Sequence, residues 1–348
     1  MAKRARGEPV EVHDPTNAPR DTLAFIGHVE ALGRVARAIR LGRPPQAWLL
    51  TGPPGVGKAT LAYRIARYLL VFGATDRGPD DLSVAPNDPA TLQVKAAAHP
   101  GLVVLKRGIN ADTGKTMTVL GVDEIRRLGG FFGLTSGAGG WRIAIIDTAD
   151  DMNDHSANAL LKILEEPPQR SLLLVLANAP ARLLPTIRSR CRRLDLKPLA
   201  DADVDAELTQ RLPELSAKDR TALVKLAGGS IGAALNLASD NGLAIAAEAE
   251  RVIDHAAAPD FAATLALAEK IARMDDGVDA FGRYLQQALS ERIRARARSG
   301  GAGLERWVEL WEKVGSSFRR TDGLHLEPRQ TIVSASRALS ETARRGAL

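Results

Sequence analysis

A glycine-rich loop lies between an apolar segment and a helical one, and it limits the folds that this chain can adopt. Residues 47–50 are apolar and lead into residues 51–58, Thr-Gly-Pro-Pro-Gly-Val-Gly-Lys, after which Leu61, Ile65 and Leu69 recur at helical spacing. Glycines here let backbone N–H groups surround an anion, and the N-terminus of the next helix adds positive potential. A glycine-rich turn without a ligand is the alternative, but the strand-to-helix context makes the G-x-x-x-x-G-K pattern specific. The loop predicts a phosphate-binding α/β domain.

Apolar segments and helical patterns alternate along the first two hundred residues. The predicted strands are residues 47–50, 102–105, 142–146 and 172–177. The predicted helices are residues 22–41, the segment after Lys58, and residues 122–132, 156–166 and 183–191. Residues 73–98, rich in Gly, Pro and Asp, are predicted to be an irregular insertion with one short helix. This alternation indicates right-handed βαβ units and a parallel sheet.

The pattern changes after residue 198, beyond which no strand is predicted. We expect a disordered basic arm over residues 1–20, the α/β domain over 21–198, a small helical domain over 199–246 and an all-helical domain over 247–348. The last domain carries Trp307 and Trp311 on one face of a helix, where we expect them to pack in a core or an interface.

Composition excludes several classes of protein. The 348 residues are 45% hydrophobic and 25% charged, which is ordinary for a globular chain. No apolar run approaches the ~20 residues of a membrane span, and the basic N-terminus lacks the apolar stretch of a signal peptide. The single cysteine, Cys191, excludes an intramolecular disulfide and a multi-cysteine zinc site. We expect a cytoplasmic protein without zinc or contact with a membrane. The net charge of +6 is compatible with an anionic partner but does not identify one.

The phosphate loop lacks parts that a hydrolysing enzyme needs. The residue after Lys58 is normally Ser or Thr, whose hydroxyl ligates Mg²⁺, and here it is Ala59. Asp147 ends the strand 142–146, where an acid could hold a magnesium-bound water. Thr148 follows it where a catalytic Glu is usual, and a threonine hydroxyl is no base near neutral pH. We interpret the neighbouring Asp150 and Asp151 as a solvated helix N-terminus.

The sequence resembles the clamp-loader branch of the AAA+ ATPases over about residues 20–245. The motifs that carry the resemblance are, from the N-terminus, Phe25-Ile26-Gly27-His28, the loop 52–58, His99-Pro100-Gly101, Gly121-Val-Asp-Glu-Ile-Arg126, the run Asn-Ala-Leu-Leu-Lys-Ile-Leu-Glu-Glu-Pro-Pro over 158–168, and Ser189-Arg190-Cys191. The run over 158–168 and the Ser-Arg-Cys triplet are specific when they occur together in this order. The resemblance implies an AAA+ P-loop domain with a parallel sheet, a small helical lid domain and an all-α collar domain that assembles a ring.

The resemblance also assigns roles to particular residues. It implies that Arg190 is an arginine finger that acts in trans on a neighbouring subunit's ATP, and that Asn178 is the polar residue that senses the γ-phosphate. A guanidinium is permanently charged and matches phosphate oxygens. From the local sequence alone, Arg188, Arg190, Arg192 and Arg193 could equally form a surface patch or bind DNA.

Active family members also carry an arginine at the position of Gly232. With Ala59, Thr148 and Gly232, the metal ligand, the base and the second sensor are all replaced. We therefore expect a rigid, non-hydrolysing subunit of the DNA polymerase III clamp loader, itself part of a polymerase holoenzyme. The expected partners are the gamma/tau and delta subunits in a hetero-pentameric ring, the sliding clamp, and primed DNA through the complex.

The residues expected to line the degenerate nucleotide site are Gly52, Gly55, Gly57, Lys58, Asp147 and Asn178. ATP or ADP, bound without hydrolysis, is the cofactor such a loop could hold, and no metal ligand is expected. Two other functions stay open. One is an autonomous AAA+ ATPase with an atypical magnesium site. The other is a DNA-binding accessory protein, which the positive charge would favour. The arginines of residues 291–298 support it little, because arginines two positions apart on a helix point in different directions and do not line one groove.

Overall fold

A computed structural model describes residues 18–108, 117, 119–133, 140–238, 241–274, 277–300, 303–324 and 327–344. The chain divides into two compact units, Met1–Ala234 and Leu235–Leu348. Most of the predicted basic arm, residues 1–17, lies outside the described residues.

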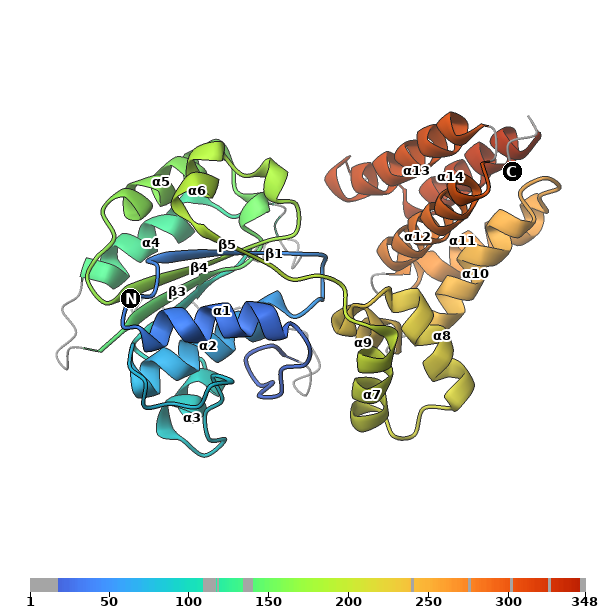
Figure 1. Cartoon of the computed structure of the whole chain (residues 1–348). Coiled ribbons are helices and arrows are strands. Elements are labelled where there is room, and N and C mark those ends of the chain that lie inside the picture. Colours follow the sequence, from blue (N-terminus) through green and yellow to red (C-terminus); the bar gives the residue numbers. More distant parts are fainter. Residues whose placement is uncertain are drawn as a thin grey trace, which may run out of the picture. The chain divides into compact units, whose positions relative to one another are not determined.

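The first unit contains a five-stranded sheet in which every pairing is parallel (Figure 1). The strand order is β2-β3-β4-β1-β5. The strands are β1 Ala47–Thr51, β2 Leu102–Leu105, β3 Arg142–Ile146, β4 Ser171–Ala177 and β5 Arg192–Asp195. The predicted parallel sheet and its first four strands are confirmed. Strand β5 was not predicted, because only Leu194 of this edge strand is buried and no apolar run marks it.

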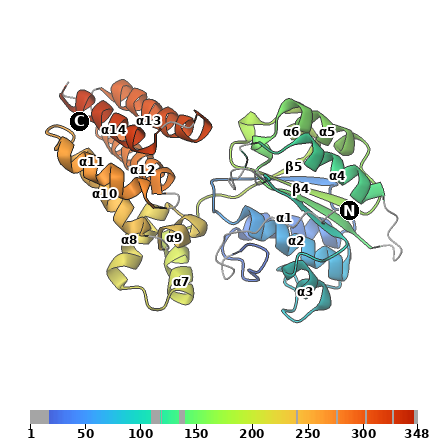
Figure 2. The same ribbon diagram turned by 180° about the vertical axis from the view of Figure 1, so that it is seen from behind.

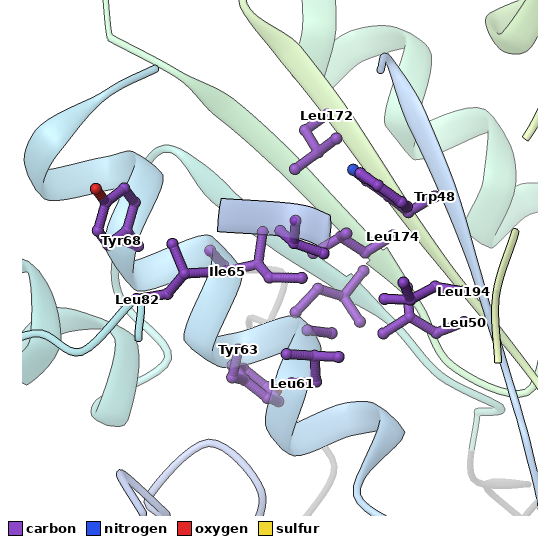
Figure 3. Close-up of a cluster of buried hydrophobic side chains, with 14 of the residues drawn as sticks. Trp48, Leu50, Leu61, Tyr63, Ile65, Tyr68, Leu82, Leu172, Leu174 and Leu194 are labelled. Carbon is purple, nitrogen blue, oxygen red and sulfur yellow. The ribbon is translucent and has the colours of Figure 1, made fainter. Parts of the chain in front are cut away.

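Helices cover both faces of the sheet, as Figures 1 and 2 show. One face carries α1 Val29–Arg40 and α2 Lys58–Phe72, and the other carries α4 Val122–Gly133, α5 Asp154–Glu165 and α6 Pro185–Arg190. Successive residues of a strand point to opposite faces. Trp48 and Leu50 therefore belong to the core shown in Figure 3, and Leu49 to the core on the other face. The predicted insertion contains one short helix, α3 Pro89–Lys95.

The first helix is shorter than predicted. It begins at Val29 and not at residue 22, because His28 adopts a left-handed conformation with φ of 49°. The chain before it has no regular secondary structure and is held by two buried arginines of α2. Arg64 donates to the carbonyl oxygen of Leu23 at 2.6 Å, and Arg67 donates to that of Thr22 at 3.3 Å. The apolar residues before Val29 thus match helical spacing by chance.

The remaining elements are helical. They are α7 Asp201–Arg211, α8 Ala217–Ala227, α9 Ile231–Ala238, α10 Gly242–Asp254, α11 Phe261–Ala272, α12 Gly277–Arg298, α13 Leu304–Leu324 and α14 Pro328–Arg344. Trp307 is buried in the second unit, whereas Trp311 is partly exposed. Arg292 of the arginine-rich segment forms ion pairs with Glu250 and Asp254. None of the described helices has an apolar stretch long enough to cross a bilayer.

Candidate functional site

Three of the predicted site segments follow neighbouring strands at one edge of the sheet. The glycine loop follows β1, Asn178 follows β4 and Asp147 follows β3, and these strands are adjacent in the order β3-β4-β1. Carboxyl ends of parallel strands are where ligands bind in open α/β sheets. The topology therefore brings the predicted nucleotide-site residues together.

Lys58 lies at the centre of this site and uses its whole donor capacity on the protein itself. Its ammonium donates to the carbonyl oxygens of Gly52 and Pro53, both at 2.8 Å, and to Oδ1 of Asn178 at 2.7 Å. An ammonium has three N–H donors, and three oxygens accept from it here. The residue is only 8% exposed, and burial lowers the pKa of Lys58 to about 8, against the attraction of Asp147 and Asp150.

The start of α9 lies on the glycine loop. Ser230 Oγ donates to the carbonyl oxygen of Pro54 at 2.9 Å, and the N–H of Gly232 donates to the carbonyl oxygen of Gly55 at 3.0 Å. A Cβ on Gly55 would lie 2.5 Å from Ser230 Oγ, and one on Gly232 would lie 2.8 Å from the Cα of Gly55. The two glycines thus permit a close backbone contact. This packing role of Gly232 depends on the fold, because in the sequence the residue is marked only by the absence of an arginine.

The contacts of Lys58 and the side chain at position 59 disfavour tight, metal-assisted nucleotide binding in this arrangement. A phosphate would need a donor from Lys58, which already serves three protein oxygens. Ser230 and Gly232 lie against Gly55 of the same loop. Ala59 offers no oxygen to a magnesium ion. The described residues also contain no group of three or more His, Cys, Asp or Glu side chains placed to hold a metal.

The acidic segment after β3 differs from the prediction. Asp150, in the short 3₁₀ helix Ala149–Asp151, is 8% exposed and not solvated. Its carboxylate accepts from the backbone N–H groups of Asn178, at 3.2 Å, and Ala179, at 2.8 Å. Asp150 therefore holds the turn that presents Asn178 to Lys58, a role for which the sequence carries no signal. Burial raises the pKa of Asp147, and the nearby Lys106 and Lys58 oppose this effect.

Arg190 is the last residue of α6 and contacts α5 and its own helix instead of the glycine loop. Its Nη2 lies 2.9 Å from Oε1 of Glu165, and its Nη1 donates to the carbonyl oxygen of Thr186 at 3.1 Å. The side chain is 38% exposed. The adjacent Cys191 is buried, and burial raises the pKa of its thiol to about 12, which favours a packing residue over a reactive thiol.

A glycine loop between β1 and α2, at the carboxyl ends of a parallel sheet, is the arrangement of a P-loop-type α/β protein. Residues 27–200 match the model of the family described as DNA polymerase III, delta subunit, and the chain belongs to this family.

Individual relatives agree with this assignment. The chain is 36% identical over 185 residues to DNA polymerase III subunit delta′ of Pseudomonas aeruginosa, an overlap of 53% of each chain. It is 31% identical over 204 residues to subunit delta′ of Escherichia coli, covering 59% of this chain and 58% of that one. It is also 29% identical over 180 residues to subunit gamma/tau of Mycobacterium bovis, covering 49% of this chain and 28% of that one. The match thus spans little more than half the length of the delta′ relatives.

Proposed function

We propose that this chain is a non-hydrolysing subunit of a DNA polymerase III clamp loader that supplies Arg190 in trans to the ATP site of a neighbouring gamma/tau subunit. Membership of the family supports the clamp-loader role. A contrast within the chain supports a subunit that supplies an arginine but does not itself hydrolyse ATP. Its phosphate loop is closed by Lys58, Ser230 and Gly232, whereas the candidate finger Arg190 remains exposed.

The closed loop supports a subunit that does not turn over ATP. Ala59 lacks the hydroxyl that would ligate magnesium, and Thr148 lacks a carboxylate to activate water. Thr148 also has a left-handed backbone, with φ of 53°, so it is held in a conformation that β-branched residues rarely adopt. We expect the isolated protein to bind ATP or ADP weakly, with no gain from Mg²⁺. Equilibrium binding to the purified protein with and without Mg²⁺ measures this.

The chemistry of Arg190 suits a role in trans. Its two contacts, with Glu165 and Thr186, use two of the five guanidinium N–H donors. The other three can face the oxygens of a phosphate, and the permanent charge can neutralise the charge that develops on the transferred group.

The larger assembly is part of the same proposal. In it, residues 21–198 form the AAA+ module, residues 199–246 the lid and residues 247–348 the collar. The collar joins gamma/tau and delta subunits in a ring of five that opens the sliding clamp and places it on primed DNA.

Reconstitution of the complex with an Arg190→Ala subunit tests the proposal. We expect the ring to assemble, while ATP hydrolysis at the site next to this chain falls by about 10³–10⁵-fold, the range known for arginine fingers. Arg188→Ala is the matched control, because Arg188 is also exposed on α6 but lies about 200° away around the helix. Unchanged single-turnover hydrolysis in the Arg190→Ala complex would contradict the proposal. ATP turnover by the isolated chain, lost on Lys58→Ala, would instead establish an autonomous ATPase.

A further inference from the structure

The last turn of α5 carries two acidic residues where the helix dipole disfavours them. Glu165 is the final residue of α5 and Glu166 is its C-cap, immediately before Pro167 and Pro168. Carboxylates at the C-terminus of a helix face the negative end of the dipole and destabilise it. Local helix stability therefore does not account for these glutamates.

Glu165 differs from its neighbour because it has a specific partner. Its Oε1 accepts from Nη2 of Arg190 at 2.9 Å, between residues that are 25 positions apart. Glu166 is exposed, and no ion pair joins it to a described basic residue. Of these two carboxylates, only Glu165 pairs with a described cation, and that cation is the candidate finger Arg190.

The elements that carry this pair are fixed to one another. Leu164, just before Glu165, and Ile187, at the centre of α6, are buried in the same core on one face of the sheet. Figures 1 and 2 show α5 and α6 side by side over this face. Cys191, which follows Arg190, is buried in the same core. The backbone of Glu165 is therefore held in place by the core, next to the long and flexible side chain of Arg190.

We infer that Glu165 is a positioning residue for Arg190, holding the guanidinium in the orientation from which it reaches the neighbour's phosphate. This inference rests on the proposed function. The guanidinium is held at both terminal nitrogens, Nη2 by Glu165 and Nη1 by the carbonyl oxygen of Thr186. Two anchors restrict the rotation of a side chain that is otherwise free to sample many rotamers, so less order has to be imposed in the transition state.

The hydrogen bond and the negative charge of Glu165 have separable effects. The acceptor oxygen orients Arg190, whereas the negative charge repels an incoming phosphate. Glu165→Gln retains an acceptor oxygen and removes the charge, whereas Glu165→Ala removes both. The two variants therefore distinguish positioning from bulk electrostatics.

The test uses the reconstituted complex with four forms of this subunit besides the wild type: Glu165→Ala, Glu165→Gln, Glu166→Ala and Arg190→Ala. An exposed ion pair is worth little, so we expect Glu165→Ala to lower kcat at the adjacent ATP site by about two- to fivefold, with KM for ATP unchanged. Glu165→Gln should restore at least the wild-type kcat, and Glu166→Ala should leave it unchanged. Glu165→Ala and Glu166→Ala each remove a carboxylate from the C-terminus of α5. A change in helix stability therefore cannot explain a difference between these two variants.

The outcomes distinguish the positioning role of Glu165 from the arginine-finger role of Arg190. Wild-type kcat in Glu165→Ala, together with a large loss in Arg190→Ala, overturns the positioning role and leaves the arginine finger in place. An equal loss in Glu165→Ala and Glu166→Ala also overturns it, because the effect would then come from charge at the end of α5. No loss in Arg190→Ala removes the proposed function and this inference together.

Discussion

The buried ammonium of Lys58 leads to a specific prediction about stability and pH. Replacing Lys58 with methionine keeps the aliphatic side chain and removes the charge. The carbonyl oxygens of Gly52 and Pro53 and Oδ1 of Asn178 then lose their donor. A buried polar group left without its partner costs about 1–3 kcal/mol. Three such groups lose their donor, but methionine also removes the cost of burying a positive charge, so at pH 7 we expect Lys58→Met to lower the free energy of unfolding by about 1–3 kcal/mol in total.

The difference between wild type and Lys58→Met should increase with pH. In the folded protein the pKa of Lys58 is about 8, against an ordinary value of 10.5. Between these values the folded wild type has lost the proton while the unfolded chain still holds it, so the free energy of unfolding rises with pH. Each pH unit of this window contributes about 1.4 kcal/mol. From pH 7 to pH 10 the wild type should gain about 2–3 kcal/mol of stability relative to Lys58→Met.

Urea unfolding of both proteins at pH 7, 8, 9 and 10 measures this difference. Lys162→Met, at an exposed position of α5, controls for the loss of one positive charge. A difference that stays flat or falls above pH 8 would refute the reasoning. The three acceptor oxygens would then hold the proton on Lys58 at least as tightly as water does in the unfolded chain.

Three further predictions concern two glycines and the cysteine. Gly232→Ala should lower the free energy of unfolding by about 1–3 kcal/mol, because its Cβ would meet the backbone of Gly55 at 2.8 Å. Gly33→Ala, inside α1 with nothing near its Cβ, should raise it by about 0.5–1 kcal/mol, and urea unfolding measures both. Burial raises the pKa of Cys191 to about 12, so its alkylation by iodoacetamide should occur at the rate of unfolding. Rapid alkylation of the folded protein would contradict this expectation.

The apolar runs of the sequence predict four strands of the sheet and the residues that follow their carboxyl ends. Strands buried on both faces are continuous apolar runs, and β1, β3 and β4 are such runs. Because the glycine loop, Asp147 and Asn178 each follow such a strand, a parallel sheet brings them to one edge whatever the details of packing. The family motifs added Arg190, which no local pattern distinguished from its neighbouring arginines.

The contacts of these residues depend on the folding of distant segments onto one another. Lys58 and Asn178 are 120 positions apart, and Ser230 and Pro54 are 176 apart. No periodicity spans such separations, so these contacts of the phosphate loop could not be predicted. The edge strand β5 and the buried Asp150 were missed for a related reason. Their residues are mostly polar, which in a sequence is typical of solvated loops. Their hydrogen-bonding partners lie far away in the sequence and are known only from the fold. The contact between Arg190 and Glu165 likewise exists because a shared core fixes α5 and α6 side by side.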